Sequence, residues 1–119
     1  MSKEQLDLLK NLSESNTLHE VQDYIKKVSE IRGFSKQSIE QAMLLLTEEM
    51  GELAKAIRKE KTTMSIDNNK IKNYDTIESE VADVFIVLCS ICNKLEIDLF
   101  SSLKEKEKEN MGRKWKNNF

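Results

Sequence analysis

The chain contains no proline and only three glycines, Gly33, Gly51 and Gly112, among its 119 residues. Since these two residue types most often end or interrupt helices, long stretches of the chain can continue as helix without a break. Charged residues make up 34% of the chain and are mixed in sign, which is typical of helices with solvated outer faces. The sequence therefore predicts an all-α protein and argues against a β-sandwich, a barrel or a glycine-rich phosphate-binding loop.

Capping signals and apolar periodicity predict where the helices begin and end. A short helix is expected over residues 3–12 with Ser2 as its cap, and a longer one begins at the Thr17-Leu18-His19-Glu20 capping box and ends at Gly33. After these, the pattern predicts a helix over residues 36–61 capped by Ser35, a polar connection over residues 62–74, a helix that starts at Asp75, and a helix from its cap Asp98 to about Trp115.

Four main helices of this kind favour an up-down four-helix bundle. Residues 1–16 would then be an N-terminal helical extension and residues 17–119 the bundle domain. The helix after Asp75 is apolar nearly all round, as in Val84-Phe85-Ile86-Val87-Leu88, and one small chain has difficulty covering such a helix. We therefore expect a homodimer or homotetramer with an isologous helical interface.

The net charge of −2 gives the whole molecule no strong attraction to a nucleic-acid polymer or an anionic membrane. No apolar run is long enough to span a bilayer, and the first residues lack a signal-peptide core, so we expect a soluble, cytoplasmic protein. Cys89 and Cys92 fall in the middle of an apolar helix, and His19 is the only histidine. The two cysteines are better explained as small core residues than as a redox pair or half a zinc site.

Two pairs of carboxylates lie on the faces that neighbouring apolar residues mark as buried. Glu49 and Glu52 form one pair, and Glu80 and Asp83 form the other; a spacing of three residues places both members of a pair on one helical face. Buried like charges repel each other and lose hydration, so this arrangement indicates a bound divalent cation. Mg²⁺, with Mn²⁺ as a substitute, prefers such oxygen ligands and commonly takes its remaining ligands from water and phosphates.

A metal held only by carboxylates suits phosphoanhydride hydrolysis, because it neutralises phosphate charge and orients an attacking water. Glu48 lies beside the first pair, turned by about 100° on the helix, where it either orients that water or faces solvent. A di-iron bundle would need Glu-x-x-His motifs, which this chain lacks. A solvated acidic face would lie opposite the apolar stripe rather than on it.

These motifs resemble those of a known family. Glu48-Glu49-x-x-Glu52 followed by Glu80-x-x-Asp83 is similar to the EExxE…ExxD signature of the MazG-like nucleoside triphosphate pyrophosphohydrolases, part of the all-α NTP pyrophosphatase superfamily. Residues 106–115 resemble the family's final helix, and the likeness covers about residues 18–115. The resemblance implies a MazG-like all-α fold. It also implies Mg²⁺-dependent hydrolysis of a nucleoside triphosphate to monophosphate and pyrophosphate, in a house-cleaning or pool-control role.

The resemblance also implies roles for individual residues. The metal ligands would be Glu49, Glu52, Glu80 and Asp83, and the catalytic carboxylates Glu48 and Glu49. Lys106, Asn110 and Arg113 share one face of the last helix, where they either meet the triphosphate or form part of a solvated face. Phe34 either stacks on the base or acts as a hydrophobic staple, and Trp115 is either an aromatic wall of the site or a packing residue.

Two other functions stay open on the sequence. One is a non-catalytic helical module that binds nucleotide or a partner; the four acidic positions argue against it, because no structural role requires buried carboxylates there. The other is a phosphoribosyl-ATP pyrophosphohydrolase, which the MazG-like character of residues 106–115 makes the weaker alternative.

Overall fold

A computed structural model describes residues 2–64 and 75–114, and within these ranges all regular structure is helical. The elements are α1 (Lys3–Asn11), α2 (Leu18–Arg32), the 3₁₀ helix η1 (Phe34–Lys36), α3 (Ile39–Lys61), α4 (Ile77–Lys94) and α5 (Leu99–Met111). The all-α prediction is confirmed. Most of the expected polar connection and Trp115 lie outside the described residues. No helix within the described ranges combines the length and apolar character that a membrane span requires.

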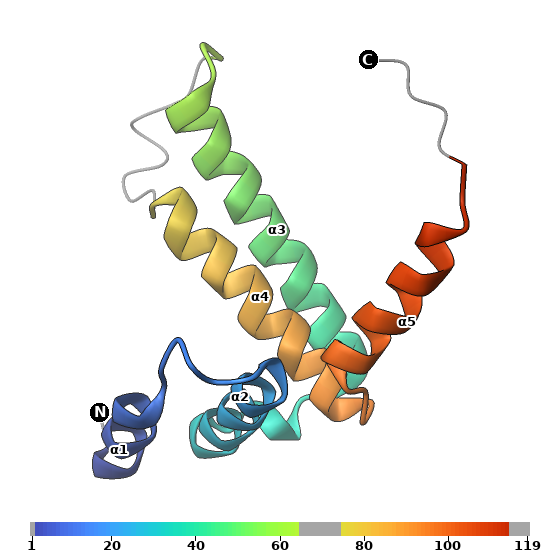
Figure 1. The fold of residues 1–119 in the computed structure, drawn as a ribbon. Helices are drawn as coiled ribbons and strands as arrows, with labels where there is room; N and C mark the ends of the chain where they lie inside the picture. Colours follow the sequence, from blue (N-terminus) through green and yellow to red (C-terminus); the bar gives the residue numbers. More distant parts are fainter. Residues whose placement is uncertain (1, 65–74, 115–119) are drawn as a thin grey trace.

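The long helices α3 and α4 run antiparallel as neighbours, and α2 packs across the end of α4 that carries its C-terminus (Figure 1). The helix α5 starts near that same end and points away from the α3–α4 pair (Figure 1). The radius of gyration is 17.5 Å, compared with about 13–14 Å for a compact domain of this length. A single chain therefore leaves the helical bundle open.

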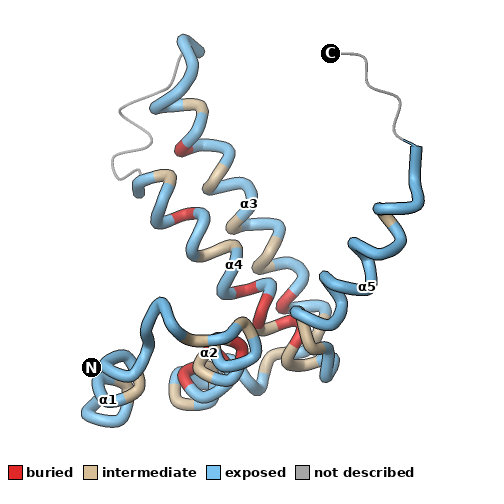
Figure 2. The backbone as a smooth tube through the Cα atoms, viewed as in Figure 1, coloured by how far each residue is buried: buried red, intermediate tan, exposed pale blue. Residues whose placement is uncertain are grey.

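The core lies where α2, α3 and α4 meet, and Figure 2 shows most buried positions there. Ala42 of α3 packs with Val87 and Ile91 of α4. Buried Gln22 of α2 ties the elements together with polar contacts: its Nε2 donates to Asn93 Oδ1 at 3.2 Å, and its Oε1 accepts from the Leu99 N–H at 2.7 Å. Because every such bond joins different elements, Gln22 fixes α2 against the ends of α4 and α5.

The helix caps explain where the sequence prediction was right and where it was wrong. Ser2 caps α1, the Thr17–Glu20 capping box opens α2, and Gly33 ends α2 in the left-handed region with φ of 83°, all as predicted. The cap of α3 is Ser38 rather than Ser35, because Ser38 forms a reciprocal capping box with Gln41. Ser35 lies in η1, and the cap of α4 is Thr76 rather than Asp75.

Asp98 caps α5 as predicted and also contacts the start of α2. Its Oδ2 accepts from the Ser101 N–H at 3.0 Å, and its Oδ1 lies 3.0 Å from His19 Nδ1. The hydrogen bond with His19, followed by those with Ser101, lowers the pKa of Asp98 from 3.8 to about 2. The ionised form of Asp98 therefore stabilises the folded state.

Replacing Asp98 by alanine should lower the melting temperature at neutral pH by removing the cap and the contact with His19. Because the pKa of Asp98 is lower in the folded state, its ionised carboxylate stabilises the folded protein at pH values above the unfolded pKa of 3.8. This stabilisation is lost as the pH falls through about 2. Thermal melts of wild type and Asp98→Ala should therefore differ most near neutral pH and converge as the pH approaches 2. Asp23→Ala, which removes an exposed ion pair with Lys27, is the control and should have little effect. A difference that is constant with pH would contradict this account.

Cys89 and Cys92 are buried and free, in agreement with their expected role as core residues. Burial raises the pKa of the Cys89 thiol to about 11, and it also raises the pKa of Cys92. Neither thiol carries the thiolate character that redox chemistry requires.

Candidate functional site

The pairing of α3 with α4 brings three carboxylates together. One oxygen from each of Glu49, Glu80 and Asp83 lies within 4.8 Å of the others. The helical register explains this meeting, because Ala42 and Val87 share the core. Glu49 follows Ala42 by seven residues and Glu80 precedes Val87 by seven, which is about two turns in each helix. Two turns beyond the apolar contact, the antiparallel helices place these carboxylates opposite each other.

The environment of this acidic cluster opposes ionisation. Glu80 is only 4% exposed, and Glu49 and Asp83 are half-buried. Burial raises the pKa of Glu49, and the negative charges of Asp83 and Glu52 raise it further. Burial likewise raises the pKa of Glu80, followed by the charges of Asp75 and Asp83. The cluster concentrates negative charge where water is partly excluded, which is the condition that a bound cation relieves.

Glu52 is not one of the three carboxylates that converge, although its charge raises the pKa of both Glu49 and Glu80. Its side chain is 52% exposed, and its Oε1 lies 3.4 Å from Lys55 Nζ. The expectation that Glu52 is buried on the packed stripe was wrong: Glu52 is exposed, whereas its neighbour Leu53 is half-buried and Ala56 is buried. Glu48 is exposed, and its charge contributes to the raised pKa of Glu49.

The donor set fits a hard divalent cation. Three carboxylates converge from two packed helices, and the group contains no thiol or imidazole. Oxygen ligands of this kind, without thiol or imidazole, match Mg²⁺ or Mn²⁺ better than zinc or copper.

A cavity of about 320 Å³ extends from this cluster toward η1. Glu49 and Asp83 line it together with Phe34. The other walls include the apolar residues Leu45, Ile86 and Val87 and the polar residues Ser29, Arg32, Gln37 and Ser90. Phe34 is 45% exposed. The structure thus places the aromatic residue predicted for base recognition in the same cavity as two of the predicted metal ligands.

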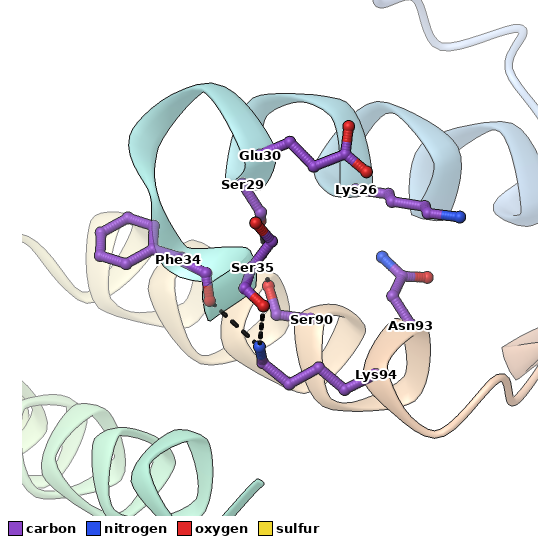
Figure 3. Close-up of a pocket in the computed structure, with 8 residues that line it drawn as sticks. All are labelled: Lys26, Ser29, Glu30, Phe34, Ser35, Ser90, Asn93 and Lys94. Carbon is purple, nitrogen blue, oxygen red and sulfur yellow. Dashed lines mark hydrogen bonds between the residues drawn. The ribbon is translucent and has the colours of Figure 1, made fainter. Parts of the chain in front are cut away.

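A second cavity of about 190 Å³ adjoins the first and shares Ser29, Phe34 and Ser90 with it. Figure 3 shows Phe34 and Ser35 on one side of this space and α4 residues on the other. The hydroxyl oxygens of Ser29 and Ser90 are 3.5 Å apart. Together the two spaces form a recess that runs from the carboxylates along α4.

The last helix is shorter than predicted: α5 ends at Met111, so Lys106 and Asn110 lie on it and Arg113 lies beyond its end. All three residues lie outside this recess. Lys106 Nζ is 3.4 Å from Glu109 Oε2, and Arg113 Nη2 donates to Glu109 Oε1 at 2.7 Å. Asn110 is half-buried, and its Oδ1 is buried without a hydrogen-bond partner. None of the three lines the cavity that contains Glu49 and Asp83. Trp115, the other aromatic candidate, lies outside the described residues.

Comparison with known families agrees with this geometry. The model of the MazG nucleotide pyrophosphohydrolase domain matches residues 37–113, which include both acidic motifs and all of α5. The chain belongs to the MazG family. No curated protein and no solved structure gives a significant match. The MazG-like resemblance of the sequence is thus confirmed, and the matched residues carry the carboxylates from both long helices.

Two polar residues of this MazG-family chain were missed by the sequence interpretation. Arg32 lines the larger cavity, and its Nε donates to Gln5 Oε1 at 3.2 Å, which joins α2 to α1. Lys94 lines the smaller cavity and contacts the backbone before α3. The sequence offered a signal only for Arg32, which stands next to the Gly33 helix end. Lys94 contacts residues about sixty positions away in the chain, where no local pattern could reveal it.

Proposed function

We propose that the chain hydrolyses a nucleoside triphosphate to nucleoside monophosphate and pyrophosphate with Mg²⁺ as its cofactor. The observation that carries this proposal is the cavity that Phe34 shares with Glu49 and Asp83. It combines a cation-binding end with an aromatic end, as a metal-bound triphosphate attached to a nucleoside would require. Membership of the MazG nucleotide pyrophosphohydrolase family supports the same reaction.

In this proposal Glu49, Glu80 and Asp83 hold the ion, and Glu52 joins them by turning away from Lys55. The bound ion supplies neutralisation of phosphate charge and activates the phosphorus toward attack. Glu49, Glu80 and Asp83 keep these positions without rearrangement because they stand on packed helices, and only Glu52 has to move. Glu48 and Glu49 orient the water and accept its proton as its oxygen bonds to phosphorus. The bond from that phosphorus to the bridging oxygen of the α–β anhydride then breaks, which separates the nucleoside monophosphate from pyrophosphate.

The recess beyond the carboxylates would accommodate the nucleoside. Its larger part, about 320 Å³, falls within the range of about 300–1,000 Å³ for small-molecule sites. Leu45, Ile86 and Val87 offer apolar surface, and the exposed ring of Phe34 offers a face on which a base can stack. The hydroxyls of Ser29 and Ser90 are the polar groups best placed to contact sugar or base.

A second copy of the chain would complete the site. Large apolar side chains stay exposed on both long helices, among them Leu44 and Met50 of α3 and Val81 and Phe85 of α4. Exposed apolar side chains in this number favour self-association. Lys106 and Asn110 lie on α5 and Arg113 follows its end, and α5 points away from the α3–α4 pair that carries the acidic cluster (Figure 1). We therefore propose a homodimer or homotetramer in which these residues meet the triphosphate bound by a neighbouring copy.

Pyrophosphate release from a panel of ribo-, deoxyribo- and damaged nucleoside triphosphates tests the proposed reaction. We expect release from a subset of them with Mg²⁺ and none with EDTA. The panel should include phosphoribosyl-ATP, because activity toward that compound alone would replace the proposed substrate. No release from any member by a folded protein would overturn the proposal in favour of a non-catalytic binding module.

A further inference from the structure

The ammonium group of Lys94 holds the segment that carries Phe34. Lys94 Nζ donates to the carbonyl oxygens of Phe34 at 3.1 Å, Ser35 at 3.2 Å and Gln37 at 2.8 Å. Figure 3 shows the first two of these bonds crossing from α4 to η1. A lysine ammonium has three N–H donors, so the three carbonyls match its full donor capacity.

The held segment, residues 33–37, has little structure of its own. It leaves α2 through Gly33 in the left-handed region and contains only the single turn of η1 before the cap of α3. Its internal backbone bonds are those from Lys36 N to Gly33 O at 3.4 Å and from Gln37 N to Phe34 O at 3.1 Å. A single 3₁₀ turn is marginal without tertiary support, and charge-assisted bonds from Lys94 supply that support.

Lys94 is also well placed electrostatically. It lies in the last turn of α4, where the negative end of the helix dipole favours a cation. The carbonyl oxygens that it contacts also carry partial negative charge, so the ammonium bridges two electronegative backbone regions. The aliphatic stem reaches across the smaller cavity, which Lys94 and Phe34 both line.

We propose that Lys94 is a positioning residue that sets the place of Phe34, and through it the fit of the nucleobase. Phe34 and Gln37 both line the larger cavity with Glu49 and Asp83, so a displacement of residues 33–37 changes the shape of that cavity. Because the Phe34 ring is 45% exposed, its own packing does little to fix it. The kinetic part of this inference rests on the proposed function, whereas its structural part stands independently.

The structural part is tested by hydrogen–deuterium exchange of the peptide that contains residues 33–38. Lys94→Met removes all three charge-assisted bonds and should accelerate exchange there by about tenfold or more, the factor expected from the loss of even one of them. Peptides from the α3–α4 core should be unchanged. Lys26→Met is the matched control, because it removes a lysine from the same cavity without removing a bond to residues 33–37. Unchanged exchange of this peptide in Lys94→Met would overturn the inference.

The kinetic part is tested on the nucleotides that the wild type hydrolyses. Lys94→Met should raise KM about tenfold and change kcat by less than about twofold. It should also reduce the differences in KM among nucleotides that carry different bases. Lys94→Arg, which keeps a charged donor, should recover most of the affinity, and it also serves if Lys94→Met fails to fold. A fall in kcat at unchanged KM would overturn the positioning role. If the wild type hydrolyses no nucleotide, the proposed function fails, and the exchange experiment still decides the role of Lys94.

Discussion

Replacing Glu80 by glutamine is expected to abolish pyrophosphate release and, without metal, to raise the melting temperature. The two effects have one cause: the carboxylate that would bind the cation is 4% exposed and lies beside other carboxylates. Glutamine has nearly the same shape but no charge, so it removes the repulsion and the affinity for metal together. We expect a loss of about three orders of magnitude in kcat/KM, comparable to removal of one preorganised electrostatic contact in an active site.

The gain in stability expected for Glu80→Gln without metal should depend on pH. Burial and the charges of Asp75 and Asp83 raise the pKa of Glu80 above its ordinary 4.5. A raised folded-state pKa contributes stability that is present below the unfolded value and is lost as pH rises through the folded value. Thermal melts in EDTA should thus show little difference between wild type and Glu80→Gln below about pH 4.5, and a growing advantage for the variant above it.

In Mg²⁺ the wild type should melt at a higher temperature than Glu80→Gln, which is the reverse of the order expected in EDTA. A ligand at about 100 times its Kd stabilises the native state by about 2.7 kcal/mol, so Mg²⁺ should raise the wild-type melting temperature and leave Glu80→Gln unchanged. Glu78→Gln is the matched control, because Glu78 is exposed on the same helix and lies outside the cluster. A metal-dependent shift that persists in Glu80→Gln, or a variant that is destabilised in EDTA, would show that Glu80 has a structural role instead.

Local signals explain the part of the fold that the sequence predicted well. The Thr17–Glu20 box, the Gly33 helix end and the Asp98 cap each depend on residues within three or four positions, and each occurs as predicted. The start of α3 was missed although its signal was also local. Ser38 has Gln41 three residues later, and this reciprocal pair outweighs Ser35, which has no such side-chain cap bond in η1.

The candidate site was predictable to the extent that it depends on helical periodicity. Glu49, Glu80 and Asp83 follow the apolar stripes, and the structure brings them together. Glu52 has the same local spacing but is exposed, whereas its neighbour Leu53 is half-buried. Only the packing of the two helices decides between neighbouring positions that lie on either side of the stripe.

Contacts between distant segments were beyond any local pattern. Gln22 reads as an ordinary polar position in α2, yet its side chain joins α2 to the Asn93 side chain and the Leu99 N–H. Lys94 reads as a basic residue in the last helical turn, yet it holds the backbone of residues 34–37. The direction of α5 is equally a tertiary property, because it depends on contacts of α5 with α2 rather than on the local sequence.

Mixing two inactive variants is expected to restore activity if α5 serves the site of a neighbouring copy. One variant is Glu49→Gln, and the other carries Lys106→Met with Arg113→Met; the second should lose about two orders of magnitude in kcat/KM, as charge-assisted contacts to phosphate are removed. After the subunits of a symmetric dimer are dissociated and recombined in equal amounts, about half the dimers are mixed. Each mixed dimer then has one site with an intact acidic cluster and an intact α5.

The expected recovery is therefore about a quarter of wild-type activity, whereas sites completed within one chain would give none. A chain that carries all three substitutions, mixed equally with wild type, provides the matched control. Sites shared between copies leave about a quarter of all the sites in that mixture active, because both sites of every mixed dimer are damaged. Sites within one chain leave about half, since each mixed dimer keeps one intact site. Recovery in the first mixture together with a quarter in the second would establish that α5 acts on the acidic cluster of its neighbour.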